Sequence, residues 1–177
     1  MIIFLIILGS LLFAGSMASL VWRISIAPAL SYLGLLTIGL TTRNGYPLLP
    51  VNTVILTTWF CMTLVVTLAV MLQAPAVRAQ TRGVGYIVTG ALAGLALSLL
   101  ATSFSSSVSI LYTVMVISVI IGIFLGFLLY TRTPEGRPVQ PGSGNFLRYL
   151  LAKGFPTAIT VMQAGVVLVL TVAVNRL

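Results

Sequence analysis

The amino-acid sequence predicts an all-α, polytopic integral membrane bundle. Hydrophobic residues make up 59% of the 177 residues and charged residues only 6%, whereas roughly 25% of a soluble domain is charged. The apolar runs are continuous and do not alternate with polar residues, which argues against a membrane β-barrel. Because lipid offers the backbone no hydrogen-bond partner, the spanning segments are expected to be helices.

Six apolar runs have about the length needed to span a membrane, roughly 17–25 residues each. In chain order they cover residues 2–22, 26–42, 51–72, 84–104, 108–131 and 155–175. No Lys or Arg precedes the first run, so we expect a retained helix rather than a signal peptide. The second run is the shortest and has Pro28 near its start. A re-entrant or interfacial second segment, and hence a five-helix bundle, stays open as the alternative.

The basic residues predict the orientation of the bundle. If the chain starts outside, the inner loops contain Arg23, Arg78, Arg82, Arg132, Arg137, Arg148 and Lys153, and the outer ends contain Arg43 and Arg176. Cytoplasmic loops are enriched in Lys and Arg, so both termini are expected to lie outside. A five-helix arrangement loses this separation of charge, which favours six spans. We expect an integral protein of the bacterial cytoplasmic (inner) membrane.

Small residues predict a close contact between the fourth and fifth runs. They recur every four residues at Gly90, Gly94 and Ser98, and again at Ser118, Gly122 and Gly126. This spacing places them on one face of each helix, which allows helices in lipid to approach closely. Counted from the turn between the runs, the two stripes lie at matching depth. We therefore predict an intramolecular seam, with a homo-oligomer contact as the alternative.

The first run carries a second kind of small-residue face. Ser10, Ala14 and Ala18 recur every four residues, with Gly15 and Ser19 beside them. Since small residues also mediate contacts between separate chains in lipid, this face is a candidate for contact with another subunit or protein.

The chain has few groups suited to catalysis or metal binding. It contains no His, one acidic residue, Glu135, and one cysteine, Cys61. Acid–base catalysis needs a group that titrates near the operating pH, and metal sites need several spaced ligands. Glu135 lies between Arg132 and Arg137, which is typical of a solvated surface charge. We expect no enzyme, no catalytic site, no metal site and no cofactor.

Two further classes of function are disfavoured by the same composition. No Asp, Glu, His or Lys lies within any of the six runs, which argues against proton coupling through the membrane. The basic residues sit singly between apolar runs, so topology explains them better than nucleic-acid binding does.

Mild polar side chains in the third and sixth runs suggest either hydrogen bonds between helices or a polar path. They are Thr53, Thr57 and Cys61 in the third run, and Thr160 and Gln163 in the sixth. Gln163 is the most demanding, because an unpaired amide in lipid costs several kcal/mol. A water-accessible cavity reaching Thr57 and Gln163 would favour the path, whereas burial against dry apolar neighbours would oppose it.

The only long loop is predicted at 132–154, on the inner side of a single transmembrane domain that covers 1–177. Its proline and glycine content over 134–145 argues against regular structure. The next residues predict a short interfacial helix that ends at Gly154 and Pro156. The basic residues expected to face anionic lipid headgroups or a partner are Arg132, Arg137, Arg148 and Lys153.

Together these patterns predict a non-catalytic membrane protein. We expect a structural or accessory subunit, or a scaffold, that assembles with itself or with other membrane proteins. The alternative is a small passive channel or transporter for a neutral or anionic solute, working as an oligomer without proton coupling.

Overall fold

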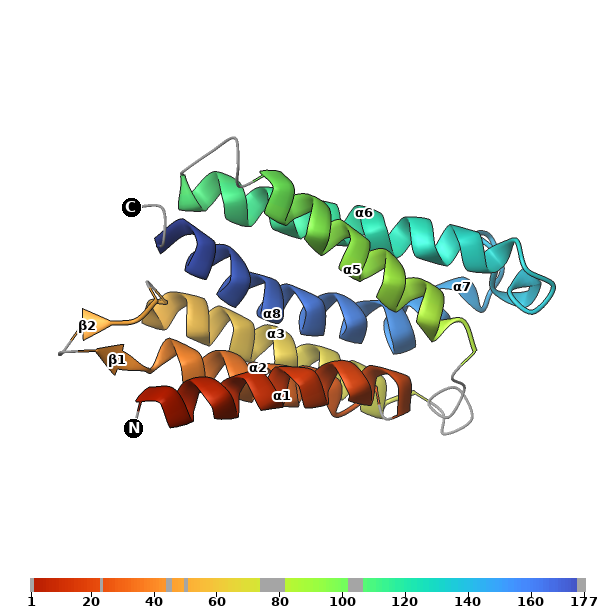
Figure 1. The fold of residues 1–177 in the computed structure, drawn as a ribbon. Coiled ribbons are helices and arrows are strands. Elements are labelled where there is room, and N and C mark those ends of the chain that lie inside the picture. The colour runs from red at the N-terminus through yellow and green to blue at the C-terminus, as the bar shows by residue number, and fades with distance from the viewer. Residues whose placement is uncertain are drawn as a thin grey trace.

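Six helices run along the bundle in alternating directions in this computed structural model, which describes residues 2–22, 24–43, 46–49, 51–73, 82–101 and 107–174 (Figure 1). They are α1 (Ile2–Trp22), α2 (Ala27–Gly39), α3 (Thr53–Met71), α5 (Val84–Ala101), α6 (Val108–Thr131) and α8 (Phe155–Val174). Helix α1 begins and α8 ends at the same end of the bundle, as an even number of passes requires. We call this the terminal end and the opposite one the basic end.

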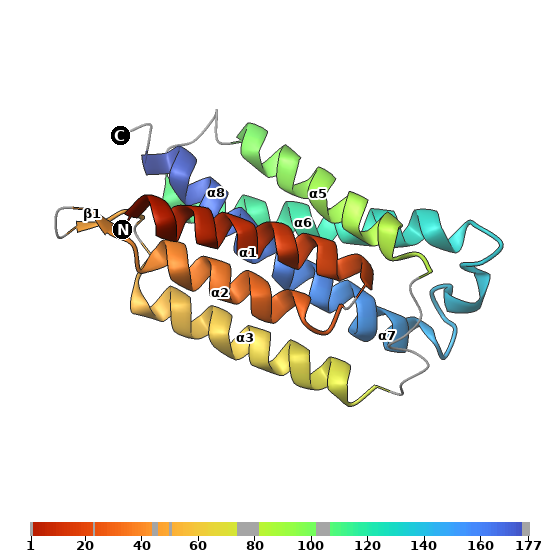
Figure 2. The same cartoon turned by 60° about the horizontal axis from the view of Figure 1, so that its bottom comes forward.

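The predicted all-α membrane bundle is confirmed. Among the described residues, five helices are long and apolar enough to cross a membrane. Helix α2 has 13 residues and is only about 20 Å long, yet it lies beside α1 between the two ends of the bundle (Figures 1 and 2).

The predicted span 26–42 is too long at its far end. Helix α2 stops at Gly39, and the chain then enters a two-residue antiparallel hairpin, β1 (Thr42–Arg43) with β2 (Tyr46–Pro47). The span predicted from residue 51 begins instead at Thr53, because Asn52 caps α3 by accepting a hydrogen bond from the Ile55 N–H at 2.9 Å. The predicted ends at residues 104 and 175 lie outside the described residues.

Helix α8 forms the centre of the bundle. It contacts α1, α2 and α3 on one side and the α5–α6 pair on the other (Figures 1 and 2). In the 18-residue stretch of Phe146–Val172 that could span a membrane, 67% of the residues are buried inside the protein, against 11% in the corresponding stretch of α1. The last helix in the chain is therefore the core of the fold, and α1 lies at its edge.

The predicted short interfacial helix does not end at Gly154 and Pro156. Helix α7 (Phe146–Tyr149) passes into a π-helical segment, η2 (Leu150–Gly154), and this leads directly into α8. In η2 the Phe155 N–H donates to the Leu150 carbonyl, five residues back. Pro156 has no N–H to donate, and the wider π turn accommodates this missing donor within a continuous helix.

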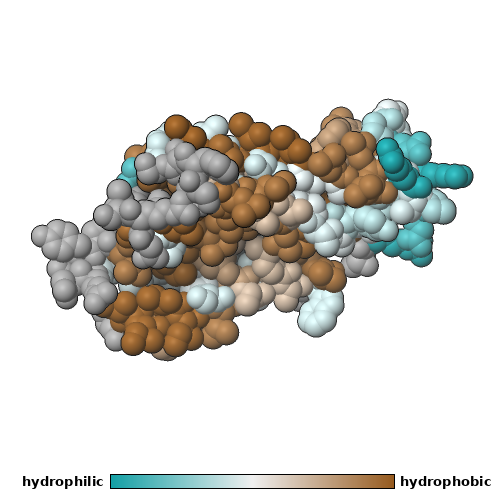
Figure 3. All heavy atoms as spheres, turned by 45° about the horizontal axis from the view of Figure 1, so that its top comes forward, coloured by the Kyte–Doolittle hydropathy of each residue, from teal (hydrophilic) through white to brown (hydrophobic). Residues whose placement is uncertain are grey.

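The outer surface divides into an apolar flank and a polar end. On the face of the bundle shown in Figure 3, hydrophobic residues cover much of the surface, and the most hydrophilic atoms gather at one end. That polar end is formed by the loop after α6, which contains a 3₁₀ turn, η1 (Arg137–Val139). Such a distribution suits a bundle that is surrounded by lipid and exposes its loops to water.

Candidate functional site

The polar residues of α8 lie in the centre of the bundle. Thr157, Thr160 and Gln163 are all fully buried. The two threonine hydroxyls donate to carbonyls one turn earlier in their own helix, that of Lys153 at 2.8 Å and that of Pro156 at 2.7 Å. These side chains are therefore satisfied locally, as is usual for threonine in an apolar helix.

Two hydrogen bonds join α8 to its neighbours. Gln163 Nε2 donates to Thr63 Oγ1 of α3 at 2.7 Å, and Thr63 donates in turn to the Trp59 carbonyl at 2.7 Å. On α2, Ser31 Oγ donates to the Thr160 carbonyl at 2.9 Å. In the described part of the chain, Gln163 Oε1 has no partner. Interhelical bonds of this kind are worth about 0.6–1.7 kcal/mol each.

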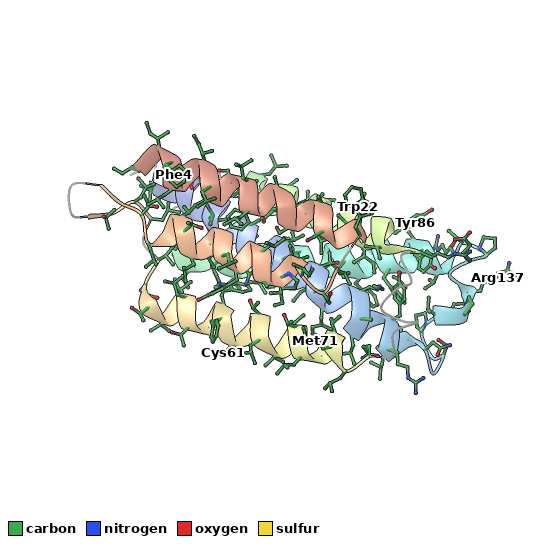
Figure 4. The ribbon with its side chains drawn as sticks, turned by 90° about the horizontal axis from the view of Figure 1, so that it is seen from below. Phe4, Trp22, Cys61, Met71, Tyr86 and Arg137 are labelled. Atoms are coloured by element: carbon green, nitrogen blue, oxygen red, sulfur yellow. The ribbon has the colours of Figure 1, made fainter. Side chains whose placement is uncertain are left out.

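The other polar residues predicted for a path lie on the outside of α3. Thr53, Thr57 and Cys61 are all exposed, and Cys61 points away from the other helices (Figure 4). The Thr57 hydroxyl donates to the Thr53 carbonyl at 2.8 Å. The structure thus does not bring Thr57 and Gln163 together, because Thr57 lies on the outer face of α3 whereas Gln163 of α8 contacts the buried Thr63 of α3.

Helices α5 and α6 touch along their backbones. A Cβ atom added to Gly90 would lie 2.1 Å from the Gly122 carbonyl oxygen, and one on Gly94 would lie 2.2 Å from that of Ser118. A Cβ on Gly126 would lie 2.1 Å from the Tyr86 carbonyl oxygen. The glycine stripes thus face each other within one chain.

The remaining seam residue of α5 is Ser98. It is buried, and its hydroxyl donates to the Leu95 carbonyl at 2.6 Å. It therefore adds no polar group that needs a partner on α6.

Lys153 was predicted to face lipid headgroups, and the structure places it elsewhere. Its side chain is only 2% exposed, within η2. Because η2 continues into α8, Lys153 falls four residues before Thr157 and seven before Thr160, on the buried face of the helix. That spacing is visible in the sequence, but the expected helix break at Gly154 concealed it. Ser31 was missed as well, since one serine in a short apolar run gives little signal.

The other basic residues of the loop lie in water-exposed positions. Arg132, Arg137 and Arg148 are exposed, as is Glu135 between the first two. Arg137 lies at the far tip of the basic end (Figure 4). These side chains are free to meet headgroups or a partner at that end.

A cluster of aromatic rings fixes the basic end. Tyr130 stacks on Tyr149 with ring centroids 5.7 Å apart and meets Tyr86 at 5.9 Å. The Tyr149 hydroxyl donates to the Arg82 carbonyl at 2.9 Å. Gly83 follows with φ of +79°, and a Cβ there would lie 2.4 Å from the Tyr149 oxygen. The start of α5, the end of α6 and α7 are thereby held together.

Helix α1 packs against the protein on the side of Gly9, and its predicted contact face lies on another side. Gly9 packs on α2, where a Cβ added to Gly34 would lie 3.2 Å from the Gly9 oxygen. The predicted contact face, by contrast, is open, with Ser10, Ala14 and Ala18 exposed. A Cβ on Gly15 would meet no described atom within 4 Å.

No protein-family model, curated protein or solved structure matches this chain.

Proposed function

We propose that this multi-pass membrane protein is a non-catalytic accessory subunit or scaffold of the bacterial cytoplasmic membrane. It assembles with itself or with another membrane protein through the outer face of α1. We call this surface the α1 face and define it by Ser10, Ala14, Gly15 and Ala18. The observation that carries the proposal is that these four residues are exposed.

Small residues contribute to helix packing only where another helix lies close to them. Helices α5 and α6 cover each other's Gly90, Gly94, Gly122 and Gly126, and α2 covers Gly9. The α1 face has no such cover from any described element. Helix α1 is 21 residues long, about 30 Å, so a partner helix has room to pack along its whole length.

The buried polar residues favour this role over a passive channel or transporter. Gln163 and Thr160 bond to α3 and α2, respectively. Each bond holds α8 in place and leaves fewer polar groups for a solute path. The exposed position of Thr57 on the outside of α3 also argues against a solute path through the bundle.

The exposed cations support an orientation with both termini outside the cytoplasm. Arg82, Arg132, Arg137 and Arg148 all lie in the segments that connect the long helices at the basic end. By the positive-inside rule this end faces the cytoplasm, where anionic headgroups attract basic side chains.

The test is the mass of the protein complex after extraction in a mild detergent, measured by size exclusion with light scattering. We expect wild type to be a complex heavier than the 18.8 kDa monomer, and Gly15→Leu to lose the partner. Ala96→Leu is the matched control, because Ala96 is a small exposed residue of a helix other than α1. A monomeric wild type, or a Gly15→Leu complex of unchanged mass, would disprove the proposal.

A further inference from the structure

We propose that a groove on the outer side of the α5–α6 pair binds one acyl chain of an anionic phospholipid. The phosphate of that lipid lies at the basic end, beside Arg82 and Arg132. This inference does not depend on the α1 face, and it assigns a ligand to a surface that the assembly proposal leaves unused.

The groove follows the glycine seam on the side of the pair that faces away from the rest of the bundle. It has a volume of about 450 Å³ and runs from Tyr86 and Leu129 at the basic end to Leu97 and Ser118 further in. The glycine backbones form its floor, and large exposed side chains such as Leu125 form its walls. It is thus a largely apolar groove, with Thr89 and Ser118 as polar residues of its lining.

The length of the groove selects the occupant. Leu97 lies eleven residues after Tyr86, and Leu129 eleven after Ser118, so the groove is about 16 Å long. The hydrocarbon core of a bilayer is about 30 Å thick, so the groove spans one leaflet only. An acyl chain of that leaflet fits this length, and the basic residues at one end of the groove favour a lipid over a partner helix.

Positive charges at the basic end of the groove, which we call its mouth, favour an anionic headgroup. Arg132 follows Leu129 by three residues, on the same side of the end of α6, and is exposed. Arg82 precedes α5 and is also exposed, and its backbone is held by the Tyr149 hydroxyl. The amide groups at the start of α5 add partial positive charge. Glu135, the one acidic residue of the chain, lies three residues beyond Arg132 in the loop.

Contacts between aromatic rings hold the mouth of the groove in a fixed geometry. Tyr86 lines the groove and contacts Tyr130, which stacks on Tyr149. Because Tyr149 also holds the Arg82 backbone, the two walls and the backbone of one of the two arginines are positioned before any ligand arrives. Such preorganisation lowers the entropic cost of binding.

The experiment is native mass spectrometry of the purified protein with equal amounts of phosphatidylglycerol and phosphatidylcholine. We expect wild type to retain one phosphatidylglycerol in preference to phosphatidylcholine. Arg82→Gln and Arg132→Gln should each reduce its occupancy about fivefold, as expected for one cation near an anionic lipid. Arg137→Gln is the matched control at the tip of the loop and should leave the occupancy nearly unchanged.

A second pair of variants tests the groove without altering charge. Ala93 lines the groove and Ala96 does not, although both are exposed on α5. Ala93→Leu should therefore abolish retention of the lipid, and Ala96→Leu should preserve it. Both positions are exposed, and a melting curve of each variant checks that the bundle is intact.

Several results would overturn the inference. Equal retention of the two lipids would remove the headgroup preference, and equal effects of Ala93→Leu and Ala96→Leu would remove the groove. Displacement of the lipid by soluble glycerol phosphate at similar concentration would indicate a free-phosphate site. A dimer that Ala93→Leu converts to monomer would show that a second copy occupies the groove.

Discussion

The contact between α5 and α6 predicts that a Gly→Ala substitution has opposite effects on stability at two positions of α5. Gly90 and Gly85 both belong to α5. A Cβ on Gly90 would lie 2.1 Å from the Gly122 oxygen and 3.2 Å from the Gly126 Cα, whereas a Cβ on Gly85 would meet no described atom within 4 Å. We expect Gly90→Ala to destabilise the protein and Gly85→Ala to stabilise it slightly.

The magnitude follows from the distances. Real Cβ contacts essentially never fall below 3.0 Å, so the two helices have to separate by about 0.9 Å at Gly90. The obstructing atoms are backbone and cannot rotate away. A gap of 0.5–1 Å forfeits about a quarter to a half of each contact's dispersion energy, and overpacking costs about 1–3 kcal/mol. We expect a loss of about 2–3 kcal/mol for Gly90→Ala and a gain of about 0.5–1 kcal/mol for Gly85→Ala.

Thermal unfolding in one detergent provides the measurement. For a chain of this size 1 kcal/mol corresponds to about 2–4 °C, so Gly90→Ala should lower the midpoint by about 5–10 °C while Gly85→Ala raises it slightly. The reasoning would be refuted if the two variants shifted the midpoint in the same direction by similar amounts, because only the packing at the seam distinguishes them.

Two more predictions concern buried contacts. A double-mutant cycle with Gln163→Leu and Thr63→Val should give a coupling energy of about 0.6–1.7 kcal/mol in unfolding titrations; a coupling near zero would mean that the hydrogen bond contributes nothing. Gly83→Ala should destabilise the protein by clearly more than Gly142→Ala. Both glycines have positive φ, but only a Cβ on Gly83 would strike neighbouring side chains. Equal melting midpoints of the two variants would contradict the importance of that contact.

Much of the fold could be predicted because lipid restricts the choice of structure. Continuous apolar runs in a chain with few charges can only be helices, and the basic loops separate the two ends. The glycine spacing on the fourth and fifth runs indicated which faces meet, because only small residues permit backbones to touch. These signals are local, and each is readable from a single segment such as Gly90–Gly94.

The arrangement of the helices around one another could not be read in the same way. Apolar residues face lipid and core alike, so the sequence did not distinguish the edge helix α1 from the central helix α8. The hydrogen-bond partner of Gln163 is Thr63, 100 residues away in the chain. The sequence around either residue does not indicate that the two side chains meet. Lys153 was misplaced because Gly154 and Pro156 are common helix breakers, whereas here a π turn carries the helix past them.

The central position of α8 has a consequence for how the protein is made. Synthesis proceeds from the N-terminal end, so α8 leaves the ribosome after every helix that it contacts. Until then, α1–α3 and the α5–α6 pair are inserted without the element that joins them, and Thr63 lacks the amide that it later accepts from. The contacts through which α8 joins α1–α3 to the α5–α6 pair can therefore form only after α8 has been synthesised.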